Sequence, residues 1–313
     1  MPGRRIVFAY FGGCELLDFA GPMQAFFEAN GFGADYRIEH CSVTPKVTTN
    51  QGLQISNLAP LPTLRPGDLA LVPGFTLEAT RLPRALITWL KKSYQLGATI
   101  TSVCTGAFAL AEAGLLNNRR CTTHWKRTAQ LQKLYPSAQV LADRLFVEDG
   151  RILCSAGMTA GIDMALALIE RDHGPLVASR AAREMVVYIR RDQHHRQNSV
   201  YLDYRTHLHP GVHSVQDWLT AHPSQKRRIQ DLARVAGMSP RNLTRAFREM
   251  TGVSIQSYRT RLRLEHAHVL MRNPAMTLEA IASECGFADA RQLRRVWRAA
   301  HHTAPSRTRH LAR

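Results

Sequence analysis

A cysteine, an aspartate and a histidine are placed in the sequence where a nucleophile or a ligand pocket could be assembled. Cys104 ends an apolar run, and the three residues after it open a helical pattern, so the cysteine lies in a sharp strand-to-helix turn. A helix N-terminus stabilises a thiolate and supplies backbone N–H groups, as an activated nucleophile or an anion site requires. His124 follows twenty residues later, and Asp18 follows the first apolar run. We expect these three side chains to share one pocket.

Two arginine-rich segments near the C-terminus repeat each other at a distance of 50 residues. Leu243 and Phe247 of the first copy correspond to Leu293 and Trp297 of the second. Each copy has the pattern of a helix, a tight turn that contains glycine, and a second helix rich in arginine. Two helix-turn-helix units in one chain predict an all-α domain that binds double-stranded DNA, because the second helix of such a unit fits the major groove.

The second helix of the first copy has a capped start and two distinct faces. Ser239 is a good N-cap, and Pro240 takes the first helical position, where its missing N–H costs nothing. Apolar residues at three- and four-residue spacings predict a buried stripe of Leu243, Ala246, Phe247 and Met250. Arginine and asparagine on the outward face are suited to base edges. The candidate DNA contacts are Ser239, Arg241, Asn242, Thr244, Arg245 and Arg248.

The second copy repeats this arrangement with Asp289 as its cap. Its expected buried stripe consists of Leu293, Val296 and Trp297. Its candidate base contacts are Arg291, Gln292 and Arg294, and Arg295 and Arg298 are expected to touch phosphate or to brace the fold. The two copies therefore predict a pair of major-groove readers.

The segment between the two units sets their spacing. Residues Ser254 to Met271 have helical spacing and contain no Gly or Pro. At a rise of 1.5 Å per residue, this helix separates the units by roughly 27 Å, close to one turn of B-DNA. A basic surface on an ordinary helical bundle is the alternative, and the agreement of repeat, caps and arginines favours DNA.

The charge of the chain supports a polyanionic partner. The 313 residues include 41 Lys and Arg against 24 Asp and Glu, a formal net charge of +17. Residues 211–313 hold 18 of these basic and 7 of these acidic residues, so the C-terminal third carries most of the excess. Arginine predominates there, and its fork suits phosphate and guanine edges. DNA is therefore the leading partner.

Apolar runs and cysteines narrow the class of protein. No apolar run approaches the ~20 residues of a membrane helix, and the first five residues lead into a strand rather than a signal peptide. Six cysteines without Cys-x-x-Cys pairs fit reduced thiols and do not predict structural zinc. We interpret the spacing of Cys121 and His124 as coincidence. We expect a soluble, cytoplasmic protein without membrane segment, metal or cofactor.

Strand-like and helix-like patterns alternate from residue 4 to about 190. The strand-like runs are Ile6–Phe11, Asp68–Gly74 and Ala98–Val103. The helical patterns are Leu16–Ala29, Arg84–Tyr94 and Gly106–Ala113. This alternation predicts a mostly parallel α/β sheet with helices on both faces, and such sheets place their chemistry at the carboxyl ends of the strands.

A polar, histidine-rich stretch lacks this periodicity and separates two domains. It contains Gln193, His194, His195, Gln197, Asn198, His207, His209 and His213. Since these spacings match no standard metal site, we interpret the stretch as a solvated connector. The expected domains are a sheet domain over residues 4–190, a connector over 191–213 and a DNA-binding domain over 214–313.

The chain from Ile229 to Arg313 resembles the AraC/XylS-type DNA-binding domain. The motifs that carry the resemblance are Ala233-x3-Gly237-Met238-Ser239, Gly252-x5-Tyr258-Arg259, Ile281-Ala282 and Gly286-Phe287. The second unit departs from the pattern at His301, His302 and Thr308.

Most of residues 4–190 resemble the DJ-1/PfpI superfamily, whose fold is flavodoxin-like and similar to class I glutamine amidotransferases. The segments that carry the resemblance are Leu17–Pro22, Val72–Gly74, Val103–Ala107, Ala111–Leu116, Thr123–Trp125 and Ser155–Asp163. The resemblance implies the nucleophile-elbow position for Cys104, the acidic position beside it for Asp18, and a pocket position for His124. Gly74, Phe75 and the Thr105 amide would correspond to the oxyanion region.

Two departures weaken the resemblance to the peptidase-like members of that superfamily. Thr105 stands where those members place the histidine that pairs with the cysteine. Phe75 stands where a second glycine is usual, and it narrows the oxyanion pocket. Thr105 instead resembles isocyanide-hydratase members and the GlxA-type regulators.

GlxA-type transcriptional regulators join both domains, and the resemblance to them extends over nearly the whole chain. It implies a sensor and dimerisation domain for a small nitrogenous metabolite such as an amino acid or betaine. It also implies operator DNA, a homodimer, RNA polymerase as a further partner, and regulation rather than catalysis. The competing hypothesis is a cysteine-dependent hydratase or amidase of the DJ-1/PfpI superfamily. An inert, structural Cys104 and a redox sensor with a low thiol pKa are further alternatives.

Overall fold

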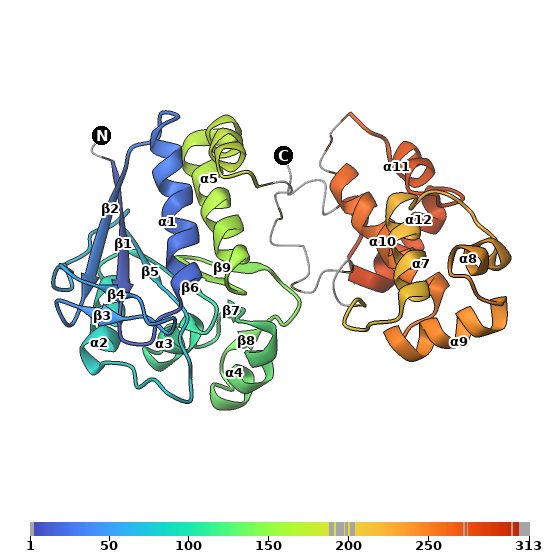
Figure 1. Cartoon of the computed structure of the whole chain (residues 1–313). Coiled ribbons are helices and arrows are strands. Elements are labelled where there is room, and N and C mark those ends of the chain that lie inside the picture. The colour runs from blue at the N-terminus through green and yellow to red at the C-terminus, as the bar shows by residue number, and fades with distance from the viewer. Residues whose placement is uncertain are drawn as a thin grey trace. The chain divides into compact units, whose positions relative to one another are not determined.

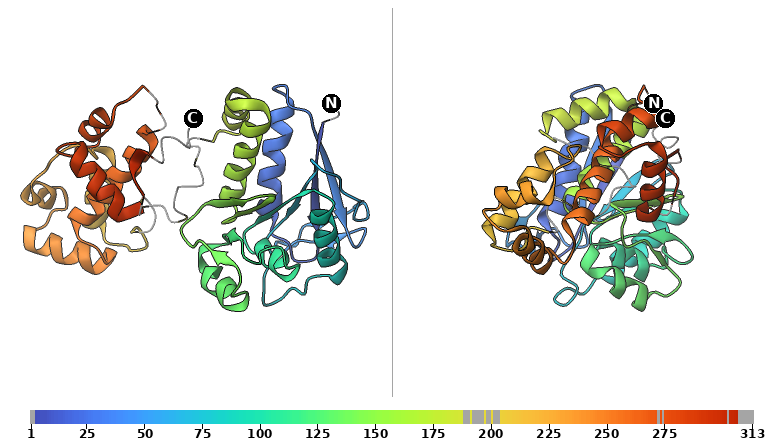
Figure 2. Two further views of the ribbon diagram at one scale, coloured as in Figure 1. Left: turned by 180° about the vertical axis from the view of Figure 1, so that it is seen from behind. Right: turned by 90° about the vertical axis from the view of Figure 1, so that its right-hand side faces the viewer.

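Two compact units make up the chain (Figures 1 and 2). The computed structural model describes residues 3–187, 191, 197, 200, 204–271, 273, 275–301 and 303–306. The N-terminal unit is Met1–Gln197 and the C-terminal unit is Asn198–Arg313, so the division lies inside the expected connector. Residues of the sequence analysis that lie outside the described part are Gln193, His194, His195, Asn198, His302 and Thr308.

The N-terminal unit alternates strands with helices, as its sequence predicts. Its strands are β1 (Arg4–Tyr10), β2 (Tyr36–Ser42), β3 (Val47–Thr48), β4 (Gln54–Ile55), β5 (Leu69–Val72), β6 (Thr99–Val103), β7 (Arg120–Cys121), β8 (Gln139–Val140), β9 (Phe146–Asp149) and β10 (Ile152–Ser155). Its helices are α1 (Leu16–Asn30), α2 (Arg84–Gln95), α3 (Gly106–Glu112), α4 (Thr128–Leu134) and α5 (Thr159–Glu184), with a short 3-10 helix η1 (Trp125–Arg127).

Six strands form one sheet in the order β2-β1-β5-β6-β10-β9. Neighbouring strands are parallel except for β9, which pairs antiparallel with β10. Figure 1 shows α1 and α5 side by side over one face of this sheet, and α2 and α3 pack on the other. Because β5 and β6 are adjacent and parallel, the turns that follow Val72 and Val103 lie at the same edge.

Strand β1 is buried on both faces, which explains its uninterrupted apolar run. Ile6 and Phe8 belong to the core formed with α1 and α5. Val7 and Ala9 belong to the core formed with α2 and α3. Successive side chains of a strand point to opposite faces, so one strand supplies both cores.

The C-terminal unit is helical in its described part. Its helices are α7 (Pro210–Ala221), α8 (Ile229–Val235), α9 (Pro240–Thr251), α10 (Ile255–Leu270), α11 (Leu278–Glu284) and α12 (Ala290–His301). One hydrophobic cluster joins α7, α8, α9 and the first half of α10, and a second joins the rest of α10 with α11 and α12. The expected pair of helix-turn-helix units is therefore α8 with α9 and α11 with α12, joined by α10.

Helix α10 begins and ends where its sequence predicts. Ser254 is its N-cap, and its side chain accepts a hydrogen bond from the N–H of Ser257 at 3.1 Å. Helix α7 begins at Pro210, within the range expected for the connector, and buries Val212 and Val215 in the first cluster.

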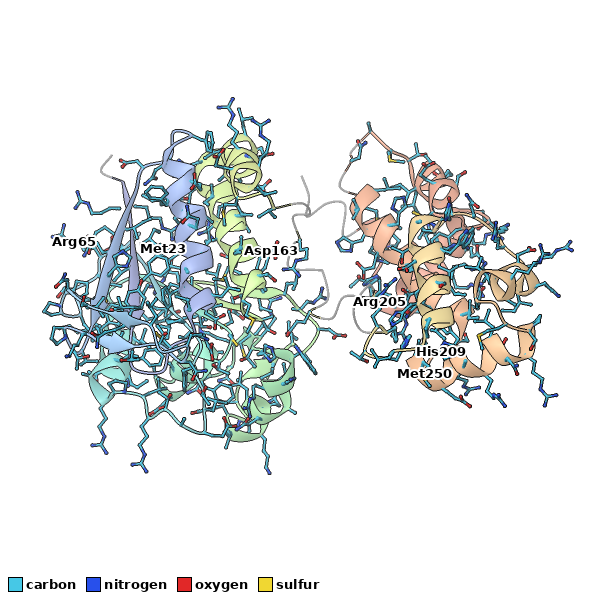
Figure 3. The ribbon with its side chains drawn as sticks, in the orientation of Figure 1. Met23, Arg65, Asp163, Arg205, His209 and Met250 are labelled. Atoms are coloured by element: carbon cyan, nitrogen blue, oxygen red, sulfur yellow. The ribbon has the colours of Figure 1, made fainter. Side chains whose placement is uncertain are left out.

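The prediction that Met250 is buried with the apolar stripe of α9 is wrong. Leu243 and Phe247 are fully buried, whereas Met250 is 40% exposed on the last turn of the helix (Figure 3). The helical period does put Met250 on the same side, but the first cluster reaches only to Phe247 and leaves that last turn uncovered.

None of the described helices is both long enough and apolar enough to span a bilayer.

Candidate functional site

Cys104 lies in the turn between β6 and α3, as its sequence context predicts. Its φ is +57°, in the left-handed region that non-glycine residues rarely adopt. The loop before α5 passes directly over it. A Cβ atom added to Gly157, whose φ is +121°, would lie 2.9 Å from the Cys104 sulfur, so only glycine allows this approach.

Asp18, in the first turn of α1, is fully buried next to Cys104. The Gly74 N–H, after β5, donates to Asp18 Oδ2 at 3.0 Å. The Met158 N–H, before α5, donates to Asp18 Oδ1 at 2.7 Å. A Cβ atom at Gly74 would lie 2.3 Å from Asp18 Oδ2, so the glycine is needed for the carboxylate to reach this amide.

Burial raises the pKa of both acidic groups in this pair. Loss of water raises the pKa of Asp18 to about 6, although hydrogen bonds from Met158 and Gly74 oppose the change. Burial, together with the charge of Asp18, raises the pKa of the Cys104 thiol to about 12. The expectation of a low thiol pKa at a helix N-terminus is therefore wrong, because desolvation and the neighbouring carboxylate outweigh the helix.

Thr105 fills the region where the resemblance implies an oxyanion site. Its hydroxyl accepts a hydrogen bond from the Phe75 N–H at 2.7 Å and donates one to the Phe75 carbonyl at 2.6 Å. The Gly74 N–H is already directed at Asp18. The amides of Gly74 and Phe75, two of the groups expected in the oxyanion region, are therefore engaged by side chains of the protein itself.

His124 approaches Cys104 only through its neighbour in the chain. The Thr123 hydroxyl donates to the Cys104 carbonyl at 2.8 Å. The His124 ring caps η1 through Lys126 N–H and lies against Trp125, with ring centroids 5.7 Å apart. Within the described residues, no hydrogen bond joins His124 to Cys104, and no group of three or more His, Cys, Asp or Glu could hold a metal ion.

A hollow in the N-terminal unit is lined in part by Phe75. It is a cavity of about 430 Å³ whose walls carry both aromatic and charged side chains. Its lining residues include Phe75, Phe108, Glu112 and Tyr135. Phe75 therefore both lines this cavity and is hydrogen-bonded to Thr105 through its backbone N–H and carbonyl.

The outward face of α9 gathers the candidate contacts of the first helix-turn-helix unit. Ser239 caps the helix, and its hydroxyl accepts from the Asn242 N–H at 3.3 Å. Thr244 donates its hydroxyl proton to the Pro240 carbonyl at 2.9 Å, so that proton is used within the helix. A surface hollow of about 510 Å³ is lined by Ile229, Pro240, Arg241, Thr244, Arg245 and Arg248.

The candidate DNA contacts of α12 are exposed or half-buried, but two of them already make contacts within the protein. Asp289 caps the helix as expected, accepting from the Gln292 N–H at 2.6 Å. The Gln292 side chain in turn accepts from the Ala288 N–H at 2.7 Å, so it helps to cap its own helix. Arg294 lies 3.6 Å from Glu279 of α11. Arg291 and Arg298 are exposed and take part in no ion pair among the described residues.

Comparison with known proteins agrees with both units. Residues 4–171 match the DJ-1/PfpI family, and residues 232–310 match a helix-turn-helix domain family. The HTH-type transcriptional regulator CdhR of Pseudomonas aeruginosa is 30% identical to this chain, over 96% of this chain and 90% of its own length. The chain belongs to the DJ-1/PfpI family. Within it, the chain is one of the HTH-type transcriptional regulators that carry an AraC-type helix-turn-helix domain.

Other similar proteins include both a transcriptional regulator and an enzyme. The HTH-type transcriptional regulator GlxA of Rhizobium meliloti is 31% identical, over 64% of this chain and 62% of its own length. An isonitrile hydratase of Pseudomonas putida is 34% identical, over 40% of this chain and 54% of its own length. The crystal structure of an AraC family transcriptional regulator from Pseudomonas putida covers 58% of this chain and 99% of its own, with a TM-score of 0.53 and 22% identity. That structure supports the fold of the DJ-1/PfpI unit.

Sequence reasoning assigned no role to the loop that completes the DJ-1/PfpI site. Gly157 and Met158 contact Cys104 and Asp18, although the segment from Ser155 to Asp163 entered only as part of the family pattern. The signal that could have found them is the glycine-rich start of α5 directly after an apolar strand, since such a turn presents free N–H groups.

Asp18 should make the stability of the protein fall as the pH rises from about 4 to about 6. Its pKa is higher in the folded state than in the unfolded state, so the stability it contributes is complete below about pH 4 and is lost as the pH passes the folded value. A shift of this size corresponds to a contribution on the order of 3 kcal/mol. Asp18→Asn should remove that pH dependence.

The measurement is urea unfolding of the full chain from pH 4 to pH 8, compared between wild type and variant. Asp35→Asn, which changes an exposed carboxylate, is the matched control and should follow the wild type. Parallel curves for wild type and Asp18→Asn would contradict the raised pKa.

Proposed function

We propose that a small nitrogenous metabolite binds at the Asp18–Cys104 pair and controls how this regulator binds its operator. The observation that carries the proposal is the buried carboxylate of Asp18, whose ionised form is destabilised by burial. A cationic nitrogen placed beside it would offset that cost, because buried charges are stable when they are paired. An amino acid or a betaine supplies such a cation.

The site is suited to binding rather than to turnover. A thiol with a pKa of about 12 is protonated at neutral pH, and the thiolate is the nucleophilic form. The amides of Gly74 and Phe75 already donate to Asp18 and Thr105, so neither of these two donors is free to stabilise an oxyanion. We therefore propose that the chain is not an enzyme, although the related hydratase belongs to a fold that can support catalysis.

The DNA-binding role belongs to α9 and α12 in this proposal. Their outward residues contact the two major-groove segments of one operator half-site, and a homodimer presents two such pairs. The domain division proposed is a sensor over residues 4–190, a connector over 191–213 and a DNA-binding domain over 214–313. RNA polymerase is a further proposed partner at the promoter.

The test is a binding titration of the full chain with a fluorescent duplex from its own upstream region. Each of a panel of amino acids and betaines is added at fixed salt, with scrambled DNA as the control. One metabolite should change the affinity for the upstream duplex about tenfold, a typical size for coupling between two sites. Specific binding that no metabolite changes, together with turnover of an isonitrile, would favour the hydratase hypothesis.

The cavity beside Phe75 is the alternative location for the metabolite, and two variants separate the locations. Glu112→Gln changes the charge of the cavity without touching Asp18. Asp18→Asn changes the charge beside Cys104 without touching the cavity. Loss of the response in Asp18→Asn but not in Glu112→Gln supports the proposed site, and the reverse result places the metabolite in the cavity.

A further inference from the structure

Two residues of the expected connector are bound to the N-terminal unit. Arg191 and Gln197 both belong to that unit, and the C-terminal unit begins at the next residue, Asn198. Their side chains hold different segments of the sheet domain. Both of those segments also contact the Asp18–Cys104 pair.

Arg191 binds the first turns of α5. Its Nη2 lies 2.6 Å from Asp163 Oδ2, its Nε donates to the same oxygen at 3.0 Å, and its backbone N–H donates to Oδ1 at 3.0 Å. Its Nη2 also donates to the Thr159 hydroxyl at 2.8 Å. Asp163 is 4% exposed and is labelled on α5 in Figure 3. Charge-assisted, forked pairs of this kind are strong, so Arg191 is a firm anchor.

The anchor of Arg191 is continuous with the loop that holds Asp18. Thr159 directly follows Met158, whose N–H donates to Asp18. Met158 has φ +47° and ψ −116°, a conformation that a non-glycine residue adopts only when its surroundings enforce it. A change in the hydrogen bonds of Asp18 therefore acts on Met158, a strained residue directly before the helix to which Arg191 is bound.

Gln197 binds the segment on the other side of the pair. Its Nε2 lies 3.0 Å from each of three acceptors, which are the Thr122 hydroxyl, the Thr123 carbonyl and the Ala142 carbonyl. Thr123 in turn donates its hydroxyl to the Cys104 carbonyl. One residue, Thr123, thus links Gln197 of the connector to the backbone of the cysteine.

The attachment of Gln197 is weaker than that of Arg191. An amide NH₂ group has two hydrogens, so three acceptors must share them. Gln197 Oε1 is buried and accepts no hydrogen bond from the described residues. A half-satisfied buried amide is held marginally, because its unpaired acceptor opposes burial.

We infer that Arg191 and Gln197 are positioning residues that transmit the state of the effector site to the connector. Arg191 is the fixed point, and Gln197 is the contact that is released or tightened when the Thr122–Thr123 segment moves with Cys104. The inference rests on the proposed function for its biological meaning, since it names how the same site reaches the DNA-binding unit.

The test is hydrogen–deuterium exchange on the full chain without any metabolite or DNA. Thr123→Val removes the hydroxyl that reaches the Cys104 carbonyl and keeps the shape of the side chain. Thr101→Val is its matched control, because Thr101 also donates a buried hydroxyl to a backbone carbonyl, that of Ala70, at 2.9 Å. Exchange in the peptide that contains Gln197 should become about three- to tenfold faster in Thr123→Val, the effect of one lost hydrogen bond. It should stay at the wild-type rate in Thr101→Val.

Coupling between two sites is reciprocal, so a change at the connector should also alter the loop that binds Asp18. Arg191→Gln should speed exchange at Met158 and in the first turn of α5 by a similar factor. Arg171→Gln, which removes an exposed ion pair with Glu148, is the control and should leave that segment unchanged. Arg191→Lys keeps the charge but not the fork, so it should restore the slow exchange only in part.

Equal exchange of the connector peptide in the two threonine variants would overturn the inference. So would an Arg191→Gln protein whose α5 start exchanges like the wild type. Because neither measurement uses a metabolite, failure here is separate from failure of the proposed function, which appears as operator binding that no metabolite changes.

Discussion

Replacing Arg241 and Arg245 together with alanine should lower the affinity for the specific operator about 100-fold, since each arginine contact to a base contributes about 1 to 3 kcal/mol. Both residues are exposed on the first two turns of α9 and line the same surface hollow. Arg241 is in no ion pair among the described residues, and the Arg245 Nε lies 4.0 Å from Glu249, so neither side chain must break a strong contact to reach DNA. The measurement is fluorescence anisotropy at fixed salt.

The matched control removes two positive charges from the N-terminal unit instead. Lys91 and Lys92 are exposed on α2, and Lys91→Ala with Lys92→Ala should leave the operator affinity within about threefold of the wild type. Scrambled DNA separates sequence reading from charge, because phosphate contacts act on any sequence. An equal loss on operator and scrambled duplex in the arginine variant would mean that Arg241 and Arg245 touch only phosphate.

The two helix-turn-helix units should contribute unequally to the DNA sequence preference. Gln292 caps its own helix through Ala288, and Arg294 is paired with Glu279, so using either for base contacts requires giving up an internal contact. In α9, Asn242 corresponds to Gln292 and forms no side-chain hydrogen bond among the described residues, and Arg241 forms no ion pair there. Thr244, which corresponds to Arg294, does use its hydroxyl proton within the helix. The sequence repeat predicts two equivalent readers, whereas the contacts indicate that α9 contributes the larger share of sequence preference.

Local signals explain why most of the elements could be predicted from the sequence. The capped, Gly- and Pro-free run from Ser254 to Met271 became α10 within one residue at each end. The alternating sides of β1 and the turn at Cys104 follow from patterns that span fewer than ten residues. Such patterns are set by neighbours in the chain, which a sequence displays directly.

The site could be predicted only in part, because its decisive contacts join distant segments. Asp18 and Met158 are 140 residues apart, and the sequence around either residue does not predict their hydrogen bond. The thiol pKa depends on how deeply Cys104 is buried and on the charge beside it, neither of which is written in the turn itself. Met250 shows the same limit in the C-terminal unit, since the helical period cannot tell where the covering cluster ends.

Trp297→Ala should destabilise the second helix-turn-helix unit by about 3 to 5 kcal/mol, the usual cost of removing a buried tryptophan. Trp297 is 1% exposed and belongs to the second cluster, and its ring centroid lies 4.2 Å from that of His301. Its indole Nε1 is buried and finds no hydrogen-bond partner in the described part of the chain. Trp297→Phe should therefore cost much less, because it removes the unpaired N–H and keeps an aromatic ring.

The division of the C-terminal unit into two clusters gives this variant a functional signature. Trp297 belongs to the second cluster and Phe247 to the first, and α10 is the helix that enters both. Trp297→Ala should abolish the contacts of α12 while α9 still binds, so operator affinity falls but sequence preference survives. Phe247→Ala should remove the preference itself. Urea unfolding with parallel operator and scrambled-DNA titrations measures both effects, and loss of all preference in Trp297→Ala would show that the two units fold as one.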